Sequence, residues 1–162
     1  MGSNMVVEAK SLGNALGNIS LAYAFYGCNK LMGVSSVLPN TVTSLVEMFW
    51  NCYIFNSPNV CNWNTSKVTN MFGAFESCYA FNQNIGNWNT SKVTNMGSMF
   101  SYATAFNQDI SNWNVSSCSN FNYMFNRAYA FNQDIGNWKL RPAGATMTDM
   151  FVSASAWSTQ SA

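Results

Sequence analysis

The sequence contains no histidine, and only 8% of its 162 residues are charged. Without histidine, the chain cannot form a Ser-His-Asp or Cys-His nucleophile arrangement, the usual imidazole general base or most zinc sites. Glu47 and Glu76 hold unequal positions in the repeat described below, so they form no obvious pair of catalytic acid and base. We therefore predict that the protein is not an enzyme and uses no cofactor.

Charge of either sign is scarce and balanced. Seven Lys and Arg residues stand against six Asp and Glu residues, which gives a net charge of +1. No cluster of basic residues could neutralise a run of phosphates, so we expect no nucleic-acid partner. Asn, Ser and Thr supply most of the polarity, which predicts a neutral, hydrogen-bonding surface.

Long apolar runs are also missing. No stretch approaches the length that spans a bilayer, so we expect no transmembrane segment. The start of the chain lacks the charged residues and clean apolar stretch of a cleavable signal, and none is expected in this chain. Five cysteines at irregular spacing make a poor disulfide framework, and their disulfide state is left open.

What the sequence does contain is an internal repeat. Tryptophan recurs every 25 residues, and a phenylalanine keeps nearly the same step, followed three positions later by Cys or Ala and three further on by a large residue. A fixed period of roughly 20 to 50 residues indicates stacked repeats. We predict one domain, residues 1–162, of about six coils of 24–26 residues. The coils are centred on Phe25, Phe49, Phe75, Phe100, Phe125 and Phe151.

Within each coil, the spacing predicts one short helix and one short strand. Met96, Met99, Phe100, Ala103 and Phe106 follow helical spacing, after a residue suited to cap a first turn. The segment 110–113 is too short for a helix and predicts a strand. The expected fold class is therefore an α/β solenoid that is leucine-rich-repeat-like.

One coil alone buries too little apolar surface to offset the entropy of ordering it, so neighbouring coils must stack. Identical side chains then form columns, which we predict to be structural. An exposed tryptophan column that stacks sugars is the alternative, and the regular spacing with an apolar partner favours a core. The predicted ladder comprises Trp63, Trp88, Trp113, Trp138, Phe75, Phe100, Phe125, Phe81, Phe106 and Phe131.

The cysteines are interpreted mainly as core residues. Cys28, Cys52 and Cys78 share the position that alanine fills in later coils, which indicates a small buried site rather than thiolate metal ligands. Cys61 takes the position of Gly86 and is the best candidate for an exposed, reactive thiol.

Two further sets of polar residues recur at the coil period. Asp109 and Asp134, with Asn84 one coil earlier, are a weak candidate for a calcium site. A solvated turn is favoured, because three such groups fall short of the usual six to eight oxygen ligands, and we predict no metal site. Candidate glycosylation sites are Asn64, Asn89 and Asn114, each of which begins an N-x-S sequon.

Two stretches carry a family resemblance. The segment 24–52, AFYGCNKLMGVSSVLPNTVTSLVEMFWNC, resembles the BspA-type leucine-rich repeat. The phrase NWNTSKVTNMFGAFESCYAFNQNIGNW and its copies resemble a repeat of about 25 residues from bacterial surface proteins and mycoplasma surface lipoproteins, a domain of unknown function. The resemblance implies a solenoid at the cell surface or outside the cell, often in adhesion, without known catalysis.

Two non-catalytic functions stay open. The first is a recognition or adhesion scaffold that binds a protein or glycan through its repeated polar face. The alternative is a self-assembling structural subunit that stacks end to end into a filament or layer, because neither end of the chain resembles a polar cap. The ligand is not identified by the sequence.

Overall fold

Regular secondary structure is scarce in this protein. The computed structural model describes residues 7–9, 17–140 and 144–157. Four short strands form two parallel pairs, β1 with β3 and β2 with β4, and one 3-10 helix, η1, follows them. Their bounds are β1 Val7–Ala9, β2 Ile19–Ser20, β3 Leu31–Val34, β4 Val42–Ser44 and η1 Pro58–Asn62.

The predicted α/β solenoid of six coils, each with a short strand and a short helix, is wrong. Within the described residues there is no α-helix, and no strand follows β4. The expected helix between Met96 and Phe106 and the expected strand at 110–113 consist of turns and irregular chain. The leucine-rich-repeat-like assignment fails with them, because that repeat requires a strand in every unit.

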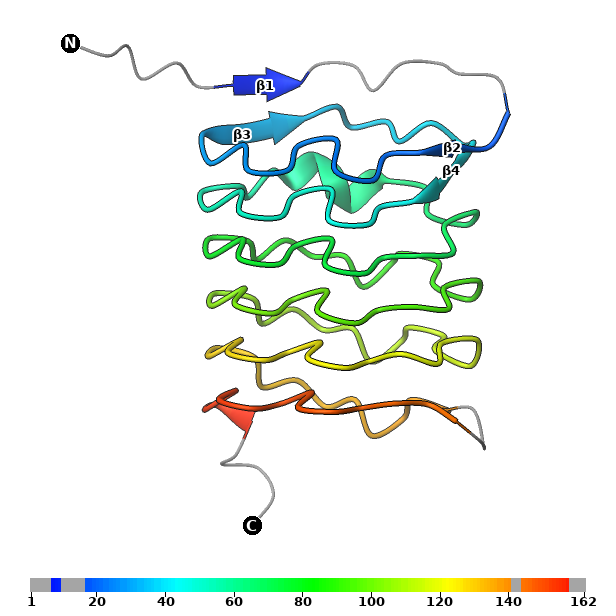
Figure 1. Ribbon diagram of the computed structural model, residues 1–162, viewed down its shortest axis with the longest axis vertical. Helices are drawn as coiled ribbons and strands as arrows, with labels where there is room; N and C mark the ends of the chain where they lie inside the picture. Colours follow the sequence, from blue (N-terminus) through cyan, green and yellow to red (C-terminus); the bar gives the residue numbers. More distant parts are fainter. Residues whose placement is uncertain (1–6, 10–16, 141–143, 158–162) are drawn as a thin grey trace, which may run out of the picture.

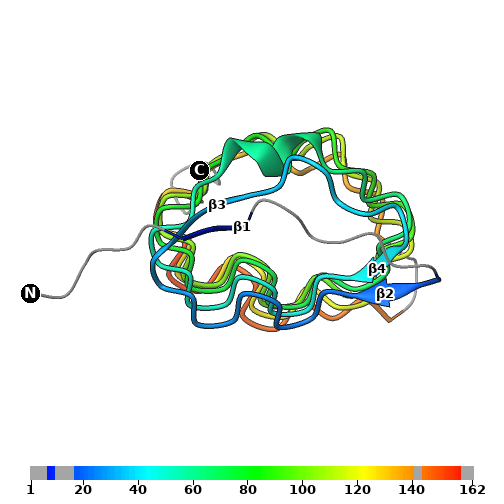
Figure 2. The same ribbon diagram turned by 90° about the horizontal axis from the view of Figure 1, so that it is seen from above.

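The sequence repeats nevertheless lie directly on one another. Figure 1 shows successive passes of the chain stacked along the long axis, and in Figure 2 the passes superimpose as a flattened ring. We call one such pass, of about 25 residues, a rung. Isolated parallel bridges join one position of each rung to the same position of the next. The bridged residues are Ser44, Asn70, Asn95, Asn120 and Thr146.

Backbone hydrogen bonds between rungs explain why no helix forms. The N–H groups of Phe75 and Ser77 donate to the carbonyls of Met99 and Ser101 in the next rung, at 3.0 and 2.8 Å. The N–H of Cys78 instead donates within its own rung, to the Phe75 carbonyl at 3.1 Å. An α-helix requires each N–H to bond four residues back along the same segment. Donating alternate N–H groups to another rung excludes that pattern.

Two left-handed residues per rung impose this path. The positions two before and two after the repeating phenylalanine have a positive φ in every rung from Phe25 to Phe151. A non-glycine residue in this region costs roughly 1 to 2 kcal/mol, which the hydrogen bonds between rungs must offset. The residues two before the phenylalanine are Tyr23, Glu47, Gly73, Ser98, Tyr123 and Asp149. Those two after it are Gly27, Asn51, Ser77, Tyr102, Arg127 and Ser153.

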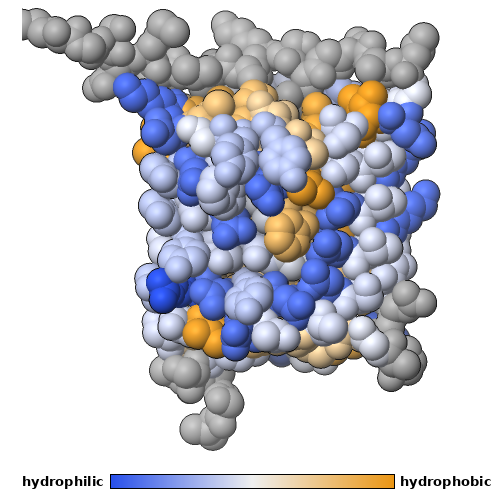
Figure 3. Space-filling model, in the orientation of Figure 1, coloured by the Kyte–Doolittle hydropathy of each residue, from blue (hydrophilic) through white to orange (hydrophobic). Residues whose placement is uncertain are grey.

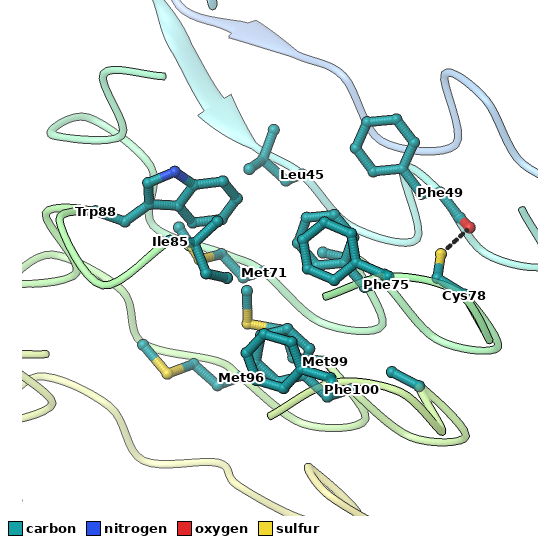
Figure 4. Close-up of a cluster of buried hydrophobic side chains, with 14 of the residues drawn as sticks. Leu45, Phe49, Met71, Phe75, Cys78, Ile85, Trp88, Met96, Met99 and Phe100 are labelled. Carbon is teal, nitrogen blue, oxygen red and sulfur yellow. Dashed lines mark hydrogen bonds between the residues drawn. The ribbon is translucent and has the colours of Figure 1, made fainter. Parts of the chain in front are cut away.

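The repeated apolar side chains form one buried cluster along the stack. The rings of Phe75 and Phe100 lie 5.9 Å apart between centroids with 1° between their planes, and Phe100 stacks on Phe106 of its own rung at 3.9 Å. Figure 4 shows Phe49, Phe75 and Phe100 one after another, with methionine and tryptophan side chains beside them. Phe75 and Phe100 therefore each have aromatic neighbours in their own rung and in both adjacent ones.

Replacing Phe100 by Ala should lower the free energy of unfolding by about 3–5 kcal/mol, because the ring is fully buried and stacks on Phe75 and Phe125. Urea denaturation followed by circular dichroism measures the change. The exposed Asn112 provides a control, since Asn112→Ala should change stability by less than about 0.5 kcal/mol. Similar unfolding midpoints for both variants would contradict a stacked core.

Candidate functional site

The tryptophan column lies inside the protein. Trp63, Trp88 and Trp113 are 3–4% exposed, and Trp138 is half-buried. The indoles of Trp63 and Trp88 lie 6.2 Å apart with 8° between their planes. Each Nε1–H donates to a backbone carbonyl 28 residues earlier, as from Trp88 to Val60 at 2.9 Å. Trp63, Trp88 and Trp113 therefore present no open face on which a sugar could stack.

The phenylalanines of the predicted ladder are also fully buried. Phe81 stacks on Phe106 with 5.9 Å between centroids, and Phe106 stacks on Phe131 at 6.0 Å. The column that contains Phe81 stacks on the column that contains Phe75 within each rung. The ring centroids of Phe75 and Phe81, for example, lie 4.0 Å apart. The buried members are Phe75, Phe100, Phe125, Phe81, Phe106 and Phe131.

The candidate glycosylation residues are exposed but bonded locally. The Oδ1 atoms of Asn64, Asn89 and Asn114 each accept a hydrogen bond at 3.1 Å from the backbone N–H two residues on. This bond fixes the turn that carries the side chain. The three residues remain predicted glycosylation sites at the surface.

The calcium candidates have the same local role. The Oδ1 atoms of Asn84, Asp109 and Asp134 accept hydrogen bonds at 3.1, 2.9 and 2.8 Å from the backbone N–H two residues on. Hydrogen bonds from Ser111 lower the pKa of the exposed Asp109. In the described parts of the chain, no three Cys, Asp or Glu side chains gather as metal ligands. The geometry is that of three turn caps.

Three of the five cysteines are buried. The Sγ atoms of Cys52 and Cys78 lie 3.0 Å from the carbonyl oxygens of Phe25 and Phe49 in the preceding rung. Burial raises the pKa of Cys52 to about 12 and raises that of Cys78 well above its ordinary value. It also raises the pKa of Cys118 to about 11. These thiols are protonated at neutral pH and poor nucleophiles.

The two remaining thiols differ from the sequence expectation. Cys61, the candidate reactive thiol, is half-buried, and burial raises its pKa. Cys28, expected in the core, is exposed. The position three after the phenylalanine is covered by the rung before it, and Phe25 belongs to the first of the aromatic rungs. The end of a column is therefore less buried than its interior.

A group of side chains on the first rungs was not predicted from the sequence. The rings of Tyr26 and Trp50 lie 4.3 Å apart, and those of Tyr23 and Tyr26 lie 6.0 Å apart. Partial burial raises the pKa of Tyr26, and the nearby charges of Glu47 and Glu76 add to the rise. We call these five side chains the aromatic-acidic cluster. The available signal was that the two positions involved, two before and one after the repeating phenylalanine, carry no constant residue.

Gly73 allows the two glutamates to approach one another. A Cβ atom at Gly73 would lie 2.9 Å from Cγ of Glu47 and 3.4 Å from Oε2 of Glu76. The backbone there also has a φ of +59°, which glycine adopts without strain. Any side chain at this position would displace Glu47 or Glu76.

The electrostatics of Glu76 reflect this crowding. Burial raises its pKa to about 7, hydrogen bonding from Trp50 opposes the rise, and the charge of Glu47 adds to it. Among the described residues, no lysine or arginine shifts the pKa of Glu76. The cluster therefore brings two carboxyl groups together, and no described cation acts on that of Glu76.

The comparison with known proteins concerns nearly all of the described chain. A family profile described as "Mycoplasma protein of unknown function, DUF285" matches residues 19–103 and again residues 43–162. The chain belongs to this family. The resemblance to a mycoplasma repeat family of unknown function is thus confirmed, while the match does not extend to BspA-type repeats. No curated protein and no solved structure matches this DUF285 chain.

One further observation bears on partners of this DUF285 member. Across the described residues, none of the helical structure has the length and apolar character needed to cross a bilayer.

The stability of the wild type should fall as the pH rises from about 4.5 to about 7. Glu76 in the unfolded chain loses its proton near its ordinary value of 4.5, whereas in the folded protein its pKa is about 7. Between these values the unfolded state binds fewer protons, so raising the pH favours unfolding. Thermal midpoints at several pH values measure the effect.

The Glu76→Gln variant lacks the group that titrates, so it should not show this loss of stability. Its stability relative to the wild type should therefore increase as the pH rises toward neutrality. Asp109→Asn is the control with the opposite sign, because the lowered pKa of Asp109 contributes stability that is lost as the pH falls. Identical pH profiles for the wild type and Glu76→Gln would contradict the raised pKa.

Proposed function

We propose that the protein is a non-catalytic recognition module that binds a protein or a glycan through exposed side chains that differ between rungs. The residues that repeat are occupied in holding the rungs together, as the buried Trp88 and the turn-capping Asn89 illustrate. They have little capacity left for an outside partner. The proposed contact face is therefore the variable part of the surface rather than the repeated polar part.

Exposed tyrosines are the observation that carries this proposal. Tyr53 and Tyr79 are stacked at 5.0 Å with 7° between their planes. On the side of the molecule seen in Figure 3, apolar residues are scattered among polar ones. Tyrosine is enriched at recognition surfaces, because it offers a large, rigid contact area and a hydroxyl. The exposed tyrosines are Tyr23, Tyr26, Tyr53, Tyr79, Tyr123 and Tyr129, with exposed fractions of 38–56%.

The stack does not require these rings. The position of Tyr53, Tyr79 and Tyr129 is held in the rung before Tyr129 by Thr104, whose hydroxyl donates to the Tyr79 carbonyl at 3.2 Å. The rungs therefore stack with a small hydroxyl side chain at this position as well as with a tyrosine. Aromatic side chains that packing does not demand are candidates for contact with a ligand.

We further propose a location at the cell surface or outside the cell, with a role in adhesion. The family match and the resemblance of the segment 24–52 to BspA-type repeats support this proposal. Kinship with the BspA-type repeats is itself part of the proposal.

Binding to immobilised glycans and extracellular-matrix proteins tests the recognition function. We expect the wild type to bind at least one of them, and Tyr53→Ala/Tyr79→Ala to weaken that binding by at least about tenfold, as loss of a stacked hot spot does. Asn112→Ala is the matched control and should bind as the wild type does. Absence of binding, or binding that no exposed tyrosine influences, would refute the proposal.

End-to-end self-assembly is a second candidate, supported by one column of asparagines. The N–H of Asn107 donates to Oδ1 of Asn82 at 3.0 Å, and the N–H of Asn132 donates to Oδ1 of Asn107 at 2.9 Å. Oδ1 of Asn132 is buried and has no hydrogen-bond partner among the described residues. A rung of another molecule could supply the missing donor.

Light scattering and electron microscopy over a concentration series test this second candidate. Self-assembly predicts rods of uniform width whose length increases with concentration, because a contact between unlike ends need not close. A monodisperse monomer of about 18 kDa at every concentration would refute it.

A further inference from the structure

We propose that the aromatic-acidic cluster of Tyr23, Tyr26, Glu47, Trp50 and Glu76 binds lysine or arginine side chains in a basic segment of a partner protein. The inference rests on the recognition function proposed above and adds the chemistry of the ligand. It follows from three features of the cluster: two glutamates lie close together, aromatic rings adjoin them, and no described lysine or arginine shifts the pKa of Glu76.

The carboxylates of the cluster are not needed by the fold. The position of Glu47 is held in other rungs by Tyr23, Gly73, Ser98 and Tyr123, and by a second acidic residue only at Asp149. The position of Glu76 is held by Trp50, Ser101 and Asn126. The backbone hydrogen bonds are the same in each case. The N–H of Glu47 donates to the Phe72 carbonyl as that of Ser98 donates to the Asn122 carbonyl, and the N–H of Glu76 donates to the Gly73 carbonyl as that of Ser101 donates to the Ser98 carbonyl. Packing therefore does not explain why both positions carry glutamate.

Placing the two glutamates together is unfavourable in the free protein. The whole chain has only six acidic residues, yet the side chains of two of them lie beside Gly73. Partial burial and mutual repulsion oppose ionisation of Glu76. A cation from outside would relieve both effects, and none of the described lysines or arginines shifts the pKa of Glu76 or Tyr26.

The adjoining rings suit an organic cation. Tyr26 and Trp50 form a tilted pair at 4.3 Å, and their faces attract ammonium and guanidinium groups. The same chain shows this pairing elsewhere, where the guanidinium of Arg127 lies 5.0 Å from the ring centroid of Tyr102 and Nη1 donates to its hydroxyl at 2.7 Å. At Tyr26 the carboxylates are present instead, and the cation is left for a partner.

Exposure favours a side chain of a protein over a free small cation. Tyr23 and Tyr26 are 56% and 45% exposed, so the cluster is open to solvent rather than a closed cage. At an exposed site a cation gains only about 0.5–1 kcal/mol from a ring. A basic segment adds further contacts and a second cation, and the two glutamates on successive rungs can each pair with one.

Binding of a fluorescent peptide with four alternating lysine and serine pairs, blocked at both ends, tests the proposal by anisotropy. The full chain should bind this peptide and should bind the same peptide with acetylated lysines at least about tenfold more weakly, because acetylation removes the charge. Glu47→Gln/Glu76→Gln should weaken binding of the lysine peptide by at least about tenfold. Tyr26→Ala should weaken it by about two- to fivefold, the loss of one exposed cation–π contact.

Asp109→Asn/Asp134→Asn is the matched control, because it removes the same total charge at a distance in the sequence. Asn84 makes the equivalent turn-capping bond, so asparagine is tolerated there. This variant should change affinity by less than about twofold. Thermal unfolding must show both double variants folded; if Glu47→Gln/Glu76→Gln unfolds, the single Glu47→Gln decides by the same comparison.

Failure of this inference can be told apart from failure of the recognition function. Equal weakening by both double variants, or no binding of the lysine peptide, would overturn the inference. If a glycan or neutral protein still bound in a manner dependent on Tyr53 and Tyr79, recognition would stand without the cationic ligand. If the wild type showed no tyrosine-dependent binding to any of these ligands, both the inference and the recognition function would be overturned.

Discussion

The structure depends on backbone hydrogen bonds that pass from one rung to the next. They require the chain to turn at two left-handed residues, one on either side of each phenylalanine, so that alternate N–H groups point along the stack. The buried rings and the tryptophan Nε1–H bonds add to this arrangement rather than create it. Without the bonds between rungs, the left-handed residues would only cost free energy. The backbone therefore sets the rung spacing, and the side chains adapt to it.

The period, the columns and their members could be foreseen from the sequence, because they follow from spacing alone. The local structure could not. A step of three from Phe100 to Ala103 and again to Phe106 fits a helix face, but here it arises from successive turns, each closed by a bond three residues back. Helix and turn share this spacing and differ in where alternate N–H groups go. That choice depends on the neighbouring rung, which no local pattern describes.

The same limit applies to the surface. Asn64, Asn89 and Asn114 drew attention because they repeat, and the structure shows each bonded to its own turn. Glu47 and Glu76 were set aside as a catalytic pair because their positions are unequal. The two side chains can lie close together because Gly73 has no side chain to fill the space between the rungs. In a repeat protein, repetition marks what the stack requires, and exposed exceptions mark what it leaves free for a ligand.

The fixed step between equivalent residues also bears on how such molecules change length. Because Trp88 bonds Val60 just as Trp113 bonds Ile85, a rung inserted in frame would find the same donors and acceptors above and below it. Duplication or deletion of one 25-residue unit in the gene would thus lengthen or shorten the protein without disturbing any column. Relatives can then differ in reach by whole rungs while each unit keeps an independent outer surface on which new contacts can evolve.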